Sequence, residues 1–217
     1  ALYRIYYDYD TDKDRKELFG TILISVFTIS IFFVLSLILF QETVQQIYRS
    51  ISFYPYFMYA ILIVFCQAIH LIPSIYLQIK QRANLFVIIS IGLFVTKTIL
   101  VLLFLIFFQK GVVGYLQAEL IALIIFSPIY FYIIYKDISF KWNYNILRNV
   151  LNFSLPMIPA VLSAWVLNLS DRIFIERFFT LEEVGIYSLA YQIAGGVLLF
   201  TLAFKKAYDP YFFNIVS

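Results

Sequence analysis

The chain has 217 residues, of which 63% are hydrophobic and 13% are charged, and its formal net charge is +3. Soluble domains carry about a quarter charged residues, so this composition excludes a protein that keeps its surface in water. The basic residues are not interleaved with exposed aromatic residues on a polar scaffold, which argues against nucleic acid as a partner. One cysteine, Cys66, and one histidine, His70, exclude an internal disulfide and a Cys/His metal cluster, and no cofactor is indicated.

The chain opens with a polar segment, residues 1–17, and no signal peptide is visible. It lacks an initiator methionine and ends at Ser217 just after an apolar stretch, so we expect a piece of a longer protein. Six later stretches are apolar over about the 20 residues that a helix needs to cross a bilayer. The sequence therefore predicts an all-α, polytopic membrane helical bundle of six transmembrane helices, over residues 18–40, 55–78, 85–108, 112–135, 151–174 and 184–204.

Local signals mark the last two of these helices. Pro156 and Pro159 lie near the start of the fifth, where a proline costs little in a first turn and kinks the helix further in. Thr180 and Glu183 precede the sixth at the spacing of a capping box. The connection between the two helices is therefore expected to be a tight turn.

Lysine and arginine residues predict the orientation of the chain in the membrane. One set of alternate loops carries 11 of them and the other set carries 4. Because cytoplasmic loops are enriched in these residues, both ends of the chain and the longest connection, 136–150, are expected in the cytoplasm.

Polar side chains follow single faces of several predicted helices. Gln67, His70, Ser74 and Gln78 share a face of the second helix, and Ser90 aligns with Lys97 in the third. Such residues pack helices together or line a wet cavity, and both interpretations stay open. The single histidine is either a satisfied interior residue or a proton relay.

Lys97 lies near the middle of the third helix, where an ammonium group is costly and marks a candidate functional site. Glu119 lies on the following, antiparallel helix, at a depth that differs by about 6 Å, which a lysine side chain can reach across. The pair is either a structural ion pair or a cavity charge that meets an anionic ligand and is tuned by Glu119.

A third group of polar residues lies near the outer end of the fifth helix and in the sixth. Asp171 and Arg172 are neighbours that point about 100° apart, so they do not simply neutralise each other. The guanidinium of Arg172 could bind a phosphate in its planar fork or extend to the outer interface. In the sixth helix, Gln192 is accompanied by Tyr187 and Tyr191.

Several enzyme classes lack their signals in this sequence. No phosphate-binding GxxxxGK[ST] motif occurs, and a single histidine without a nearby Ser/Asp partner makes a hydrolytic triad improbable. No polar loop exceeds about 15 residues, which is too short for a catalytic domain. We expect a protein that is not an enzyme.

Three stretches resemble one family of membrane proteins. The start, ALYRIYYDY, is similar to the cytoplasmic segment that leads into the third helix of Wzx-like oligosaccharide flippases. The later runs SLPMIP, DRIFI and LEEVGIYSLAYQ (154–192) resemble their seventh and eighth helices, and residues 203–213 resemble the segment after the eighth helix. The stretch between, 18–150, matches in hydropathy and spacing only.

The resemblance implies part of a two-lobe exporter of the multidrug/oligosaccharidyl-lipid/polysaccharide exporter superfamily. Residues 1–135 would form four helices of the first lobe with their cytoplasmic segment, 136–150 the linker between lobes, and 151–217 the first two helices of the second lobe. Cavities in this family are cationic, which fits Lys97 and makes Arg172 and Arg4 further candidates, while Glu119 departs from a purely basic lining. The family also implies a bacterial inner membrane location, with polysaccharide polymerase and glycosyltransferases as partners.

The resemblance implies an undecaprenyl-pyrophosphate-linked oligosaccharide as substrate, and together with the polar faces it predicts a flippase in surface polysaccharide biosynthesis that works by alternating access. Lys97 and Arg172 would meet the pyrophosphate. Two alternatives stay open, a multidrug or ion antiporter of the same superfamily and a membrane polysaccharide polymerase or ligase. The substrate-binding candidates are Arg4, Gln67, His70, Lys97, Glu119, Asp171, Arg172, Tyr187, Tyr191 and Gln192.

Overall fold

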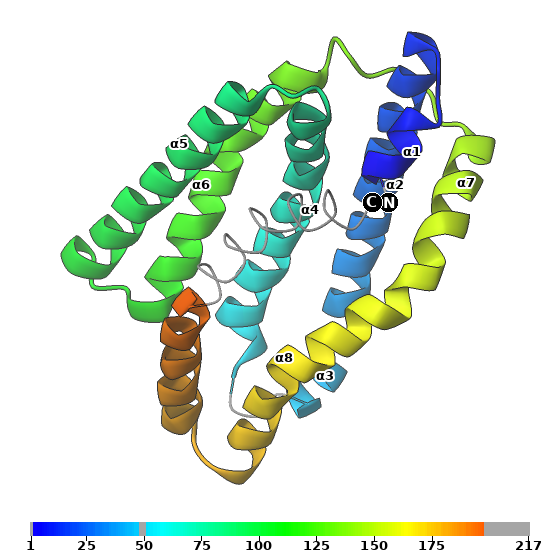
Figure 1. Ribbon diagram of the computed structural model, residues 1–217. Helices are drawn as coiled ribbons and strands as arrows, with labels where there is room; N and C mark the ends of the chain where they lie inside the picture. Colours follow the sequence, from blue (N-terminus) through cyan, green and yellow to red (C-terminus); the bar gives the residue numbers. More distant parts are fainter. Residues whose placement is uncertain (1, 48–50, 198–217) are drawn as a thin grey trace, which may run out of the picture. The chain divides into compact units, whose positions relative to one another are not determined.

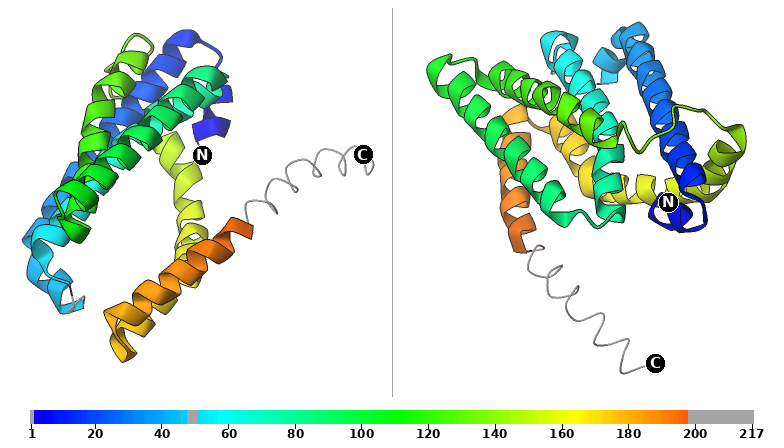
Figure 2. Two further views of the ribbon diagram at one scale, coloured as in Figure 1. Left: turned by 90° about the vertical axis from the view of Figure 1, so that its left-hand side faces the viewer. Right: turned by 90° about the horizontal axis from the view of Figure 1, so that it is seen from above.

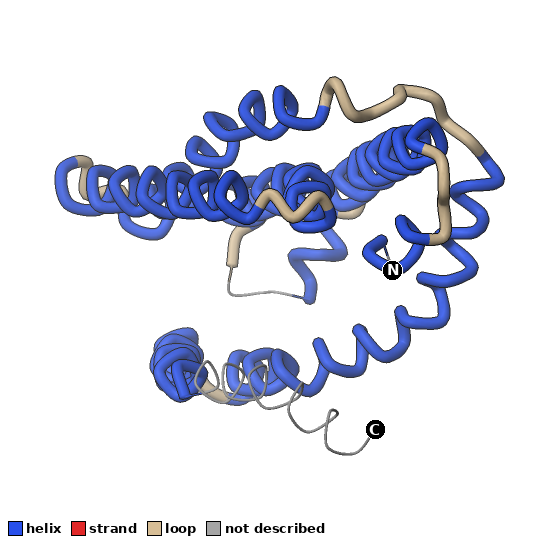
Figure 3. Tube along the Cα trace, turned by 45° about the horizontal axis from the view of Figure 1, so that its top comes forward, coloured by secondary structure: helices blue, strands red, loops and turns tan. Residues whose placement is uncertain are grey.

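A computed structural model describes residues 2–47 and 51–197, and within these ranges helix is the only regular secondary structure (Figure 3). The predicted all-α fold is confirmed. The elements in chain order are α1 (Leu2–Tyr7), α2 (Asp12–Leu39), α3 (Gln41–Ile47), the π-helical turn η1 (Phe53–Phe57), α4 (Met58–Ile79), α5 (Ala83–Leu102), the π-helical turn η2 (Leu103–Phe107), α6 (Gly111–Ile134), α7 (Tyr144–Ser154), the 3-10 turn η3 (Leu155–Met157), α8 (Ile158–Phe178) and a last helix over 181–197.

Five helical stretches in the described residues are long and apolar enough to cross a membrane, and they correspond to the first five predicted spans. They are Asp12–Leu39, Phe53–Ile79, Ala83–Phe107, Gly111–Ile134 and Tyr144–Phe178. The sixth predicted span, 184–204, is helical over 184–197, and its remaining residues lie outside the described part of the chain. Six spans therefore stay a prediction, and the predicted cytoplasmic tail and the family-like stretch 203–213 also lie outside the described part.

The first span begins earlier than the hydropathy predicts, at Asp12 in place of residue 18. Thr11 is its N-cap, and the hydroxyl of Thr11 accepts a hydrogen bond from the backbone N–H of Asp14 at 3.1 Å. The acidic side chains of Asp12 and Asp14 in the first turn also interact favourably with the positive end of the helix dipole. The helix therefore extends beyond its apolar part by more than one turn.

The fifth span also begins earlier, because α7 occupies residues predicted as part of the connection 136–150. The side-chain oxygen of Asn143 accepts from the backbone N–H groups of Asn145 and Ile146 and caps this amphipathic helix. Pro156 lies in the 3-10 turn η3, and Pro159 lies in the first turn of α8, where its missing N–H costs little. Residues 135–143 are the nonhelical part, and their role as an inter-lobe linker stays a prediction.

The chain divides into two compact units, Ala1–Pro156 and Met157–Ser217. In the first unit, α4 packs against α2 and α6, and α6 packs against α4 and α5 (Figures 1 and 2). In the second unit, α8 and the helix over 181–197 form a helical hairpin joined at Phe179 and Thr180 (Figure 1). The backbone N–H of Glu183 donates to the Thr180 hydroxyl at 3.3 Å, so the predicted cap and tight turn are confirmed.

The buried core of the first unit gathers at the end where α2 begins and α4 and α6 finish. Its largest fully buried side chains include Tyr76, Phe19, Leu18, Leu77 and Ile134. The nonhelical segment 135–143 docks there on α2. Elsewhere, apolar side chains of the long helices are exposed, as expected for surfaces that face lipid.

Backbone-to-backbone contact holds the segment 135–143 on α2. The N–H of Ser139 donates to the carbonyl of Lys16 at 3.1 Å, and a Cβ on Gly20 would lie 1.8 Å from the Ser139 carbonyl oxygen. Thr21 donates to the carbonyl of Lys141 and accepts from the N–H of Asn143. The hydroxyls of the first helix therefore serve packing at this end.

Candidate functional site

A polar pocket lies between α4, α5 and α6, in the membrane-spanning part of the first unit. Its volume is about 410 Å³. Most of its wall is apolar, and its polar side chains come from all three helices, namely Gln67, His70, Ser74, Ser90, Lys97 and Glu119. The two polar faces predicted for the second and third helices therefore meet at one pocket.

The charged centre of this pocket is an ion pair. The Lys97 Nζ lies 2.9 Å from the Glu119 Oε1, and their side chains are 33% and 14% exposed. The same carboxylate oxygen accepts a hydrogen bond from the Gln67 side-chain amide at 3.3 Å. Lys97 also lies 5.4 Å from the centre of the Tyr115 ring. The pocket thus holds one cation and one anion, and both are anchored to a neighbouring helix.

The buried histidine of α4 lies on the wall of the same pocket. One ring nitrogen of His70, Nε2, lies 2.8 Å from the Ser127 hydroxyl, and the ring lies 4.6 Å from that of Tyr130. His70 is 6% exposed, and its Nδ1 has no hydrogen-bond partner among the described residues. This nitrogen is itself buried, so it is an unsatisfied polar atom within the wall of the pocket and is not exposed to a ligand.

Three residues that contact the pocket side chains were not among the sequence candidates. Tyr115, Ser127 and Tyr130 lie on the same helix as Glu119, at helical spacings of four, eight and eleven residues from it. A polar face of α6 is therefore visible in the sequence once Glu119 is taken as its reference. The apolar residues between them conceal this face in a hydropathy profile.

The second unit brings together the predicted residues of the fifth and sixth helices. Arg172 donates to the Ser188 hydroxyl at 3.1 Å and to the carbonyl of Asn168 at 3.0 Å, and it lies over the ring of Tyr191 at 5.0 Å. Tyr187 donates to the carboxylate of Asp171, and Tyr191 donates to the side chain of Asn168. Gln192 is exposed on the same helix. These bonds hold α8 and the helix over 181–197 together.

Arg4 lies apart from the Lys97 pocket. Its guanidinium is 5.1 Å from the centre of the Phe153 ring, beside a separate hollow of about 480 Å³ between α1 and α7. The ten candidate residues therefore form three groups. Four lie at the pocket of α4, α5 and α6, five lie in the second unit, and Arg4 stands by itself.

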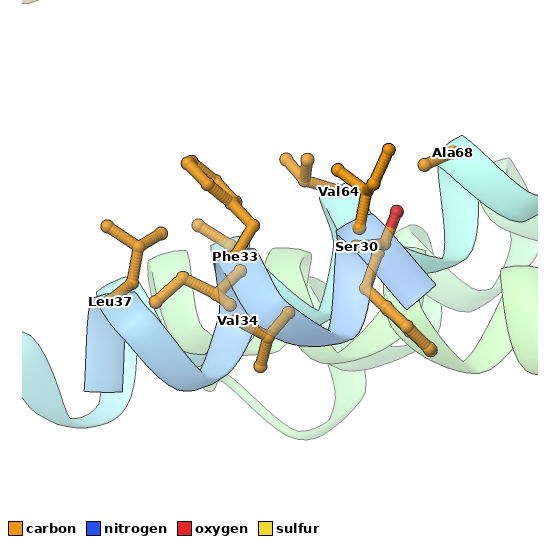
Figure 4. A pocket seen from close by; sticks show the side chains of 10 residues that line it. Ser30, Phe33, Val34, Leu37, Val64 and Ala68 are labelled. Carbon is orange, nitrogen blue, oxygen red and sulfur yellow. The ribbon is translucent and has the colours of Figure 1, made fainter. Parts of the chain in front are cut away.

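An apolar groove lies between α2 and α4 (Figure 4). It has a volume of about 280 Å³, and the side chains of Phe33, Val34, Leu37 and Val64 line it, with the Ser30 hydroxyl as a polar exception. Such a surface suits hydrocarbon and offers nothing to bind a charged headgroup.

Comparisons with known proteins identify the family. The sequence model of the family described as "Polysaccharide biosynthesis protein" matches residues 10–208. A curated Haemophilus influenzae protein named for the Lsg locus is 26% identical over 149 residues, which are 64% of this chain and 36% of that protein, so the chain spans about a third of this relative's length. No solved structure matches the chain. The chain is a membrane protein and belongs to the polysaccharide biosynthesis protein family.

Proposed function

We propose that the chain is part of a transporter that flips a lipid-linked oligosaccharide across the bacterial inner membrane by alternating access. The observation that carries this proposal is the cluster of Lys97, Glu119 and Gln67 at a pocket between three membrane-spanning helices. Charged side chains within membrane spans commonly mark substrate pathways, and the family places the chain in polysaccharide biosynthesis.

The pocket suits a ligand with an anionic and a hydroxyl-rich part. Lys97 would bind an oxygen of the undecaprenyl pyrophosphate in exchange for its contact with Glu119. The side-chain amide of Gln67 offers hydrogen bonds to sugar hydroxyls, and His70 lies in the pocket wall on the same helix. The apolar tail would stay in the bilayer. The ligand is released when the Lys97 ammonium returns to the Glu119 carboxylate, which restores the ion pair of the empty pocket.

The second unit carries candidate substrate contacts of its own. Arg172 carries a guanidinium without a carboxylate partner among the described residues, and Tyr187 and Tyr191 lie beside it. Arginine binds phosphate through its planar fork, and tyrosine rings stack on sugars. The excess of basic residues in one set of loops supports a cytoplasmic location for both ends of the chain. Polysaccharide polymerase and glycosyltransferases are the partners that this role implies.

The test is Lys97→Gln in the full-length protein, measured as surface polysaccharide in a bacterial strain that lacks its own copy. We expect a loss of at least tenfold at equal expression, because glutamine keeps a polar side chain and removes the charge. The matched control is Lys110→Gln, which removes a lysine at the end of the neighbouring helix, bonded to Gln117. Normal polysaccharide with Lys97→Gln would refute the proposed role of the ammonium.

A second candidate function follows from Glu119, which is more buried than Lys97. An exporter of cationic compounds would use this carboxylate as its binding group. Under that function, Glu119→Gln would abolish efflux of a cationic dye from inverted vesicles, and Lys97→Gln would leave efflux intact. If Lys97→Gln abolishes surface polysaccharide and the unmodified protein shows no dye efflux, the exporter of cationic compounds is excluded and the flippase is the candidate that is retained.

A further inference from the structure

A second charged pocket lies at one end of the first unit, away from the Lys97 pocket. It has a volume of about 180 Å³, and its charged side chains are Asp12, Arg15, Lys16, Lys80 and Asp137. We call it the interface pocket. It is formed where α2 begins, α4 ends and α6 has just ended. These are the start of the first span and the ends of the second and fourth, so all three lie on one side of a bilayer. This position is the level of lipid headgroups.

The three cations of the interface pocket outnumber its two carboxylates, Asp12 and Asp137, and none of them forms a direct ion pair among the described residues. Lys97 and Glu119 form the only ion pair in the described part of the chain, so Arg15, Lys16 and Lys80 have no carboxylate partner there. Arg15 donates through Nε to the carbonyl of Tyr9 at 2.8 Å, and Lys16 donates to the carbonyl of Lys136 at 3.1 Å. The local charge therefore remains positive.

Aromatic rings form the floor of the interface pocket. Tyr6 is 5% exposed, and the guanidinium of Arg15 and the ammonium of Lys80 lie 4.8 and 5.8 Å from the centre of its ring. Phe19 and Tyr76 continue the aromatic cluster beneath, and the hydroxyl of Tyr76 donates to the carboxylate of Asp137. The Asp137 carboxylate therefore accepts from Tyr76 and forms no ion pair with a cation among the described residues.

We propose that the interface pocket binds the phosphate of an anionic bilayer phospholipid. Basic pockets between membrane helices at the headgroup level bind such lipids, and the cations here are fixed by rings and carbonyls before the ligand arrives. The charge pattern of the loops places this end on the cytoplasmic side. The bound lipid would tie α1 to the ends of α2 and α4. This site is independent of the proposed transport function.

The test measures binding of phosphatidylglycerol to the full-length protein by native mass spectrometry, with phosphatidylcholine as competitor. The double variant Arg15→Gln/Lys80→Gln should weaken binding about thirty-fold, the factor expected for two cation contacts at a lipid surface. The matched control, Lys13→Gln/Arg148→Gln, removes two exposed cations from the same side outside the pocket and should change it less than threefold. The variant Arg15→Lys/Lys80→Arg keeps both positive charges and should retain binding. That result would show that the glutamine variants lose binding through loss of charge and not through altered folding.

Each alternative has its own outcome. Equal weakening in the two double variants would show diffuse surface attraction and overturn the proposal. Displacement of phosphatidylglycerol by inorganic phosphate at equal affinity would make free phosphate the ligand. Displacement by undecaprenyl pyrophosphate, with no preference for phosphatidylglycerol over phosphatidylcholine, would make the transported lipid the ligand. If Arg15→Gln prevents folding, the single variant Lys80→Gln should still weaken binding several-fold, and unchanged binding would refute the site.

Discussion

The ion pair of Lys97 and Glu119 can be separated into a structural and a transport contribution by a double-mutant cycle. At 2.9 Å and an effective dielectric constant of about 20, Coulomb's law gives about 6 kcal/mol for the two charges. Desolvation of both groups offsets most of this, and contacting residues usually couple by about 0.5–3 kcal/mol. Because Lys97 is 33% exposed, we expect a coupling of about 1–2 kcal/mol.

The cycle uses Lys97→Met, Glu119→Gln and the double variant, with unfolding followed in detergent. Lys97→Met should destabilise most, because it leaves the carboxylate of Glu119 with only the amide of Gln67. The double variant should recover stability, since no buried charge remains. If the changes in unfolding free energy of the two single variants simply add in the double variant, the coupling energy is zero. The ion pair then contributes nothing to stability and the electrostatic reasoning is wrong.

Transport measured on the same variants completes the experiment. If the pair serves stability alone, the double variant restores polysaccharide export together with stability. If Lys97 binds the pyrophosphate, the double variant is stable and inactive. Restored export in the double variant would therefore refute the transport role while leaving the ion pair intact as a structural feature.

Three further predictions concern packing and capping, each measured as thermal unfolding of the purified protein in detergent. Gly20→Ala should destabilise by about 3 kcal/mol or more, because its Cβ would meet the Ser139 carbonyl. The control, Gly185→Ala, faces open space and should be neutral or stabilising by about 0.5–1 kcal/mol. Equal effects of the two substitutions would contradict the docking of 135–143. Asn143→Ala should cost about 1 kcal/mol through loss of the α7 cap, and an unchanged midpoint would exclude this cap as a source of stability. Arg172→Lys keeps the charge and loses the planar fork, whose Nε bonds to Ser188 of the next helix and whose other nitrogen bonds to the Asn168 carbonyl within α8. A loss of about 1 kcal/mol is expected, and an unchanged midpoint would show that these two bonds contribute nothing to stability.

The helices and their polar faces could be predicted from the sequence because hydropathy and helical spacing are local properties. The five helices long and apolar enough to cross a membrane, the cap at Thr180 and the polar faces of the second and third predicted helices follow from such patterns. Helix starts were predicted too late at both Asp12 and Tyr144. In both cases a capped polar turn extends the helix beyond its apolar part, and hydropathy does not detect caps.

The remaining contacts depend on which helices become neighbours. Arg4 and Lys97 both looked like cavity cations, and the structure places them at different hollows of one unit. Ser127 meets His70 only because α4 packs on α6, and no spacing within either helix shows that pairing. The interface pocket combines three chain segments and a loop, so its residues look in the sequence like ordinary loop charges.

The docking of residues 135–143 on α2 has a consequence for how the protein is made. Thr21 and its partner Lys141 are 120 residues apart, so during synthesis the first span waits in the bilayer until the fourth has been inserted. Ser25 bonds meanwhile to the carbonyl of Thr21 within its own helix, at 2.7 Å, which shields its hydroxyl from hydrocarbon. A ribosome-bound intermediate that ends before residue 139 would lack this closing contact, so the start of α2 reaches its final packing only after the fourth span has been made.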